Sequence, residues 1–132
     1  MTGSTRKGHS DRDVFERLLE IWNGASTGSL ASLLSDDYRG HMLHLPDGER
    51  DAAGYAAWIS DYRDLNPNAT FELVEQFFTV DRVVSRLRAT RDSPVSGLQN
   101  SHGINIARLD GDGRIAEEWA IWSAWATQTD LI

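Results

Sequence analysis

His102 is the residue best suited to proton transfer, both by its type and by its position. An imidazole titrates near neutral pH, so it can act as a general acid or base. The turn sequence at 110–113 is typical of a β-hairpin, and it places Ile104 opposite Trp119 and His102 opposite Ile121. Alternation along the strands puts His102 on the bulkier, more apolar face. We therefore predict that His102 lines a cavity and is its main catalytic group.

Two alternatives to this interpretation stay open. His102 could be a structural histidine that hydrogen-bonds a neighbour. A slip of one residue in the hairpin would instead turn Asn105, Glu118 and Trp122 toward the cavity. Glu118 would then be the better acid.

His41 and His44 belong to a predicted strand over residues 37–45. Three residues apart on a strand, they point to opposite faces and cannot readily bind one metal ion together. We expect no metal site, and we expect one of the two to face the cavity, without deciding which. His41 is a second catalytic candidate, whereas His44 and the nearby Tyr38 are candidate ligand contacts.

Arg88 lies on the same face of a predicted strand as Arg86. An arginine inside a cavity could hold an enolate or a polarised carbonyl, so Arg88 is a third catalytic candidate. The alternative is an exposed ladder of ion pairs with Glu72 and Glu75 on the neighbouring strand.

Five tryptophans in 132 residues are many, and three of them fall within seven positions. Large rings either fill a core or line a pocket for a flat organic ligand. The sequence does not separate these roles. The candidate contacts for a small hydrophobic or aromatic ligand are Trp22, Tyr38, His44, Trp58, Tyr62, Trp119 and Trp122.

The elements that must position these residues follow from the periodicity of apolar side chains. We expect two helices, a strand, a third helix and then a four-stranded antiparallel meander. The first helix starts at the N-cap Ser10 and ends at Asn23-Gly24, and the second starts near Ser29. The third starts at the cap Asp51 and ends before residues 66–68. The remaining strands are predicted at 70–80 and 82–91 and on either side of the turn at 110–113.

Composition restricts the classes of function. The formal net charge of −7 argues against nucleic acid and anionic membranes as partners, because both attract clustered positive charge. The absence of cysteine excludes disulfides, thiolate catalysis and cysteine-based zinc sites. No apolar run approaches the length of a membrane span, and no signal peptide is apparent, so a cytoplasmic location is expected. We expect a disordered tail at 1–10 and one domain over 11–132.

This order of elements, together with the run Asp112-Gly113-Arg114-Ile115-Ala116-Glu117-Glu118-Trp119, resembles the SnoaL-like polyketide cyclase family of the nuclear transport factor two-like superfamily. The resemblance implies a cone-shaped α+β fold, in which a curved antiparallel or mixed sheet and three N-terminal helices enclose a pocket. It also implies a homodimer without cofactors and an acid that follows the strand's tryptophan. In this chain those positions hold Ala120 and Ser123 instead.

Two functions that use a pocket are compatible with these features, and a non-catalytic dimerisation module is a third alternative that only the fold supports. The first is a cofactor-independent enzyme of secondary metabolism, a polyketide cyclase, isomerase or dehydratase that works by acid/base chemistry in a hydrophobic pocket. The second is a small-molecule-binding protein that has lost the family's catalytic acid, which Ala120 and Ser123 favour. A polar pair at the floor of the pocket would indicate the enzyme.

Overall fold

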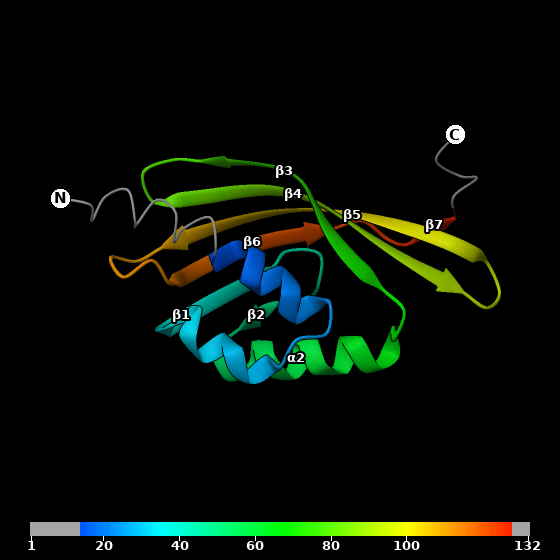
Figure 1. The fold of residues 1–132 in the computed structure, drawn as a ribbon, viewed down its shortest axis with the longest axis horizontal. Coiled ribbons are helices and arrows are strands. Elements are labelled where there is room, and N and C mark those ends of the chain that lie inside the picture. Colours follow the sequence, from blue (N-terminus) through cyan, green and yellow to red (C-terminus); the bar gives the residue numbers. More distant parts are fainter. Residues whose placement is uncertain (1–13, 128–132) are drawn as a thin grey trace.

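One curved, unclosed sheet covers the helices in the computed structural model, which describes residues 14–127 (Figure 1). The helices lie along one side of the sheet, and its other side faces outward. The predicted tail at 1–10 and the predicted cap Ser10 lie outside the described residues. The mixed α+β class expected from the sequence is confirmed.

The first helix is described over residues 14–22 and packs its apolar stripe inward. Val14, Phe15, Leu18 and Ile21 are buried, which is the spacing of one helix face. A turn follows, as predicted. There Asn23 donates to and accepts from the backbone of Phe71, which fixes the end of this helix to the sheet.

The second predicted helix is a short 3-10 helix, η1 (Thr27–Ser32), capped by the Ser26 hydroxyl. The third is an α-helix, α2 (Ala52–Leu65), and its N-cap is Asp51, whose carboxylate accepts from the Gly54 N–H at 2.8 Å. This cap confirms the predicted start, because Asp at that position satisfies a free N–H of the first turn.

Seven strands form the sheet in the described part of the chain. They are β1 (Leu34–Met42), β2 (Glu49–Arg50), β3 (Thr70–Phe78), β4 (Arg82–Ser93), β5 (Gly97–Leu109), β6 (Ile115–Trp122) and β7 (Ala126–Thr127). Their order is β2-β1-β6-β5-β4-β3, with β7 paired to β5. The meander from β3 to β6 confirms the prediction, whereas β1 lies parallel to β6, so the sheet is mixed.

The hairpin of β5 and β6 is antiparallel, but its register differs from the prediction by two residues. Ile104 lies opposite Ile121, and Ile106 opposite Trp119. The register shifts at a bulge between Arg108 and Leu109, which turn chemistry alone does not specify. Because the register differs by two residues and side chains alternate with a period of two, the central residues of both strands still divide into the same two faces as predicted.

The prediction was wrong about which of these faces points inward. Gly103, Asn105 and Glu118 belong to the inner face, whereas Ile104 and Ile121 are 43% and 49% exposed on the outer face. The physical reason is space. Aromatic rings of the helices, and the ring of Trp122 at the end of β6, fill much of the interior. The strand residues that face these rings must therefore be small. The exposed isoleucines cover the other side.

Candidate functional site

A cavity of about 230 Å³ lies between the helices and the inner face of the sheet. It is smaller than the usual pocket for a drug-sized ligand, so it suits a compact molecule. Most of its lining is aromatic or aliphatic. The lining residues are Phe15, Leu18, Leu19, Trp22, Met42, His44, Tyr55, Trp58, Tyr62, Phe71, Leu87, Ser101, Asn105, Ala120, Trp122, Ser123 and Trp125.

The ligand contacts predicted from the sequence are divided between the cavity and other sites. The structure brings Trp22, His44, Trp58, Tyr62 and Trp122 together in the lining. The remaining two do not line it. Tyr38 is buried behind the wall, and Trp119 is on the outer face, where it stacks on His41 with the ring centroids 5.6 Å apart.

The predicted placement of His102 in the cavity is wrong. Its side chain is exposed, and it lies opposite Arg88 of the neighbouring strand β4, on the outer face of the sheet. Its backbone N–H donates to the hydroxyl of Ser123, which lines the cavity. The inverted face of the hairpin is the cause.

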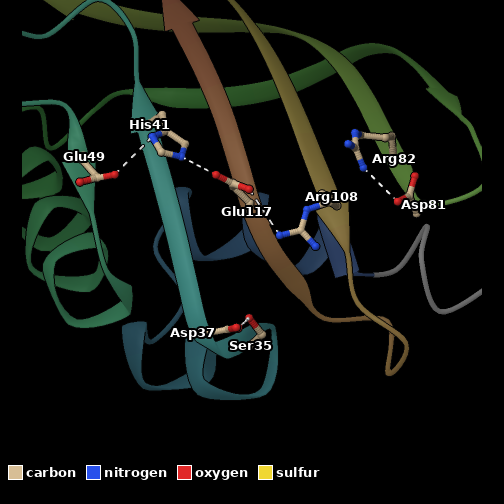
Figure 2. Close-up of polar contacts among 8 residues, drawn as sticks. All are labelled: Ser35, Asp37, His41, Glu49, Asp81, Arg82, Arg108 and Glu117. Atoms are coloured by element: carbon tan, nitrogen blue, oxygen red, sulfur yellow. Dashed lines mark hydrogen bonds and ion pairs between the residues drawn. The ribbon is translucent and has the colours of Figure 1, made fainter.

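His41 also lies outside the cavity. Figure 2 shows its ring between Glu117 and Glu49 on the surface of the sheet. Its Nε2 lies 2.7 Å from Glu117 Oε2, and its Nδ1 lies 3.7 Å from Glu49 Oε2. Arg108 contacts the second oxygen of Glu117 at 3.4 Å. His41 is therefore part of a chain of ion pairs on the surface and does not line the cavity. His44 is the histidine that faces the cavity.

Arg88 forms an exposed ion pair with Glu72 at 2.6 Å, and Arg86 pairs with Glu75 at 2.7 Å. This is the ladder that the sequence allowed as the alternative to a cavity arginine. Exposed pairs of this kind contribute little to stability because water screens them. We expect Arg88→Ala to lower the free energy of unfolding by less than about 1 kcal/mol in urea denaturation. A loss several times larger would show that the pair does more than the geometry indicates.

Trp22 is the centre of the aromatic lining. Its ring lies edge-on to Trp58 and Tyr62, with centroids 5.3 Å and 5.5 Å apart. Its Nε1–H donates to the Tyr55 hydroxyl at 3.0 Å. Edge-to-face packing and this hydrogen bond fix the ring in place, so the cavity offers a rigid aromatic wall to a flat ligand.

A buried carboxyl lies directly behind this wall. Glu118 on β6 is 0% exposed, and three side chains contact it. The Tyr38 hydroxyl donates to Oε1, the Asn105 amide donates to Oε2 at 2.7 Å, and the Tyr55 hydroxyl also hydrogen-bonds the carboxyl. Asn105 and Tyr55 both line the cavity, so they connect Glu118 to the ligand site.

Burial raises the pKa of Glu118 above its ordinary value of 4.5, and the hydrogen bonds from Tyr38, Asn105 and Tyr55 oppose this rise. Between the ordinary and the raised pKa, the folded protein keeps a proton that the unfolded chain has lost. The stabilisation from this group is therefore complete below pH 4.5 and is lost as the pH rises through the raised pKa.

Comparison with Glu118→Gln isolates this effect, because the variant lacks the titrating group. We expect the unfolding free energy of the wild type, minus that of the variant, to fall as the pH rises from about 4 to about 8. Urea denaturation at several pH values measures this difference. A difference that stays constant or increases would contradict the raised pKa.

His44 is the histidine that lines the cavity, and its Nδ1 accepts the Trp122 backbone N–H at 3.3 Å. Burial lowers the pKa of His44, which favours the neutral ring at pH 7. In the neutral ring, a nitrogen that accepts leaves the other one protonated. His44 Nε2 is therefore an N–H donor, suited to a carbonyl oxygen.

The sequence could have indicated Glu118 more strongly. Along β6 it stands between Ala116 and Ala120, two small residues on its own face of the strand. A carboxylate alternating with small residues is a sign of a face that packs against bulky partners. The contacts of Tyr38 and Tyr55 with Glu118 could not be predicted from a local pattern, because both tyrosines are far from Glu118 in the sequence.

This chain is similar to several known proteins in sequence pattern and in fold. The family model for the SnoaL-like polyketide cyclases matches residues 12–131. A search of curated proteins finds no match. Wild-type IdmH from Streptomyces antibioticus is a similar structure, with a TM-score of 0.75 at 24% identity over 86% of this chain and 91% of that one.

Two further solved structures are similar. TsrD from Streptomyces laurentii has a TM-score of 0.73 at 22% identity, over 87% of this chain and 89% of that one. A SnoaL-like polyketide cyclase from Agrobacterium tumefaciens has a TM-score of 0.70 at 16% identity, over 86% and 91%. At these identities the likeness establishes the fold.

Two structural findings concern metals and membranes. Within residues 14–127, no group of three or more His, Asp or Glu side chains could hold a metal ion. None of the helices in the described part of the chain is long and apolar enough to span a membrane.

Proposed function

This chain belongs to the SnoaL-like polyketide cyclase family, and we propose that it is a cofactor-independent cyclase or isomerase of small, hydrophobic ketones. The proposal includes a role in secondary metabolism and a cytoplasmic location. One observation carries the catalytic part: a buried carboxyl with a raised pKa is hydrogen-bonded to two residues of an aromatic cavity. Perturbed carboxyls next to a pocket are candidates for acid/base chemistry.

In this proposal Tyr55 carries the proton between ligand and carboxyl. Burial raises the pKa of Tyr55 well above its ordinary value, so a free tyrosinate is strongly disfavoured. The hydroxyl can still act as a relay. As it takes a proton from the carbon next to the substrate carbonyl, it passes its own proton to Glu118, and no charge remains on the ring.

His44 acts at the other end of the substrate. Its Nε2–H donates to the carbonyl oxygen, which becomes the enolate oxygen as the adjacent carbon loses its proton. The enolate carbon then attacks a second carbonyl and closes a ring, or it regains a proton at another carbon and completes an isomerisation. Glu118 returns the proton through Tyr55 in either case.

A second function is favoured by a specific feature of the lining. Ala120 is buried at the cavity wall, in a position where the family resemblance implies an acid. Without that acid in direct contact with the ligand, the protein would bind the same class of molecule and not convert it.

Exchange of carbon-bound protons separates the two functions without knowledge of the native substrate. The bicyclic ketone 2-tetralone is incubated with the protein in D2O, and loss of the proton signals next to its carbonyl is followed by NMR. We expect the wild-type protein to accelerate exchange over buffer, with a rate that saturates as ketone increases. Saturable binding without accelerated exchange would establish the binding protein instead.

The proposal also includes a homodimer formed through the outer face of the sheet. Phe77, Ile104 and Ile121 are exposed there, and the neighbouring Arg86 is already paired with Glu75, so the face is apolar and locally neutral. A second copy would cover these side chains.

We expect light scattering to give twice 14.8 kDa for the wild type and 14.8 kDa for Ile104→Glu. Val95→Glu is the matched control, because Val95 is equally apolar and is exposed in the loop between β4 and β5. A wild type that is monomeric at micromolar concentration would remove the dimer from the proposal.

A further inference from the structure

The side-chain oxygen of Asn105 is a buried acceptor without a partner. Asn105 is 6% exposed and lines the cavity, and its Oδ1 makes no hydrogen bond. A buried polar atom left unpaired loses its hydrogen bonds to water without replacement, so native proteins rarely leave one without a function.

The orientation of this amide is fixed by Glu118. The Asn105 NH2 group faces Glu118 and donates to Oε2 at 2.7 Å. Rotating the amide by half a turn would bring two oxygens together whenever Glu118 is ionised, as it must be to accept the proton in the proposed relay. Oδ1 is the atom that remains for a ligand.

Three other acceptors of the described lining already have hydrogen-bond partners. The Tyr55 hydroxyl accepts from Trp22 and bonds Glu118, and His44 Nδ1 accepts from the Trp122 N–H. The Ser123 hydroxyl accepts from the His102 N–H at 3.0 Å.

Ser101 is the competing acceptor. It donates its proton to the Ser123 carbonyl at 2.6 Å, and its oxygen keeps acceptor capacity. Unlike Asn105 Oδ1, this hydroxyl already makes one hydrogen bond, so leaving its lone pair free costs less.

We infer that the cavity selects ligands bearing a hydroxyl group, an enol or a phenol, whose O–H donates to Asn105 Oδ1. The inference rests on the part of the proposed function that has the cavity bind a small hydrophobic molecule. It deepens that function by naming the polar group recognised. Asn105 is a specificity-determining residue, held in position by Glu118. A site built to pair with a hydroxyl rejects an analogue that lacks the donor, because its own polar atom is then left unpaired.

The test compares two bicyclic probes of nearly the same shape, 2-naphthol and 2-methoxynaphthalene, of which only the first can donate. Calorimetry on the wild-type protein should give roughly tenfold tighter binding of 2-naphthol. Asn105→Leu, which keeps the size and removes the acceptor, should reduce this preference to about twofold or less. Ser101→Ala should retain it.

A crystal structure of the wild type with 2-naphthol gives a second measurement that does not depend on the variant folding. The naphthol oxygen should lie within hydrogen-bonding distance of Asn105 Oδ1. Equal binding of the two probes, loss of the preference in Ser101→Ala instead, or a hydroxyl bonded elsewhere would each overturn the inference. The proposed function is tested separately by the exchange of 2-tetralone protons. A failure of the inference is therefore distinguishable from a failure of the proposed function. If neither probe binds while the exchange of 2-tetralone is still accelerated, the inference alone fails.

Discussion

Glu118→Gln is expected to slow the exchange of 2-tetralone protons by about a hundredfold or more, the usual contribution of a positioned acid or base. The amide has the shape of the carboxyl but takes up no proton at neutral pH. The fold should persist, because the oxygen of the introduced amide can accept from Asn105 while the hydroxyls of Tyr38 and Tyr55 turn to accept from its NH2 group. NMR exchange rates, with circular dichroism to check the fold, measure the effect.

Tyr55→Phe tests whether the proton reaches Glu118 through this hydroxyl. If it does, the single variant should lose as much activity as Glu118→Gln, and the double variant should lose no more than either, because both remove the same path. Losses that multiply in the double variant would contradict the relay.

His102→Ala is the matched control for both variants. Its imidazole is exposed on the outer face, so we expect the exchange rate to stay within about twofold of wild type. A hundredfold loss in this variant, with Glu118→Gln unaffected, would return the catalytic role to His102 and refute the assignment made from the structure.

Gly103→Ala is expected to destabilise the fold and to disturb the cavity wall at the same time. A Cβ at this position would lie 2.6–2.8 Å from three carbons of the Trp122 ring, closer than real contacts allow. The ring must therefore move, and overpacking of this kind costs about 1–3 kcal/mol. Because Trp122 lines the cavity, binding of 2-naphthol should weaken at the same time.

Gly111→Ala is the control for this prediction. Gly111 lies in the turn between β5 and β6, and an added Cβ there meets no atom within 4 Å. Urea denaturation of the two variants gives the comparison, and we expect no loss of stability from Gly111→Ala. Equal effects in both would show that close packing of Trp122 against Gly103 does not determine the cavity wall.

Local sequence patterns were sufficient to predict most elements of this protein and their order, but not the two-residue strands β2 and β7. Apolar spacing and the cap Asp51 are local features, and they correctly predicted α2 and the meander from β3 to β6. The same local patterns made Trp22 and Trp58 candidate ligand contacts without separating that role from core packing, and both residues line the cavity.

Which face of the β5–β6 hairpin points inward depends on tertiary contacts. Alternation sorts residues onto two faces but does not orient them, and hydrophobicity favoured the wrong one. The inner face has small residues such as Gly103 because the rings of Trp22 and Trp122 already occupy the interior. The positions of these rings depend on contacts between distant parts of the chain. Only the folded protein could therefore show that Glu118, and not His102, is the candidate acid.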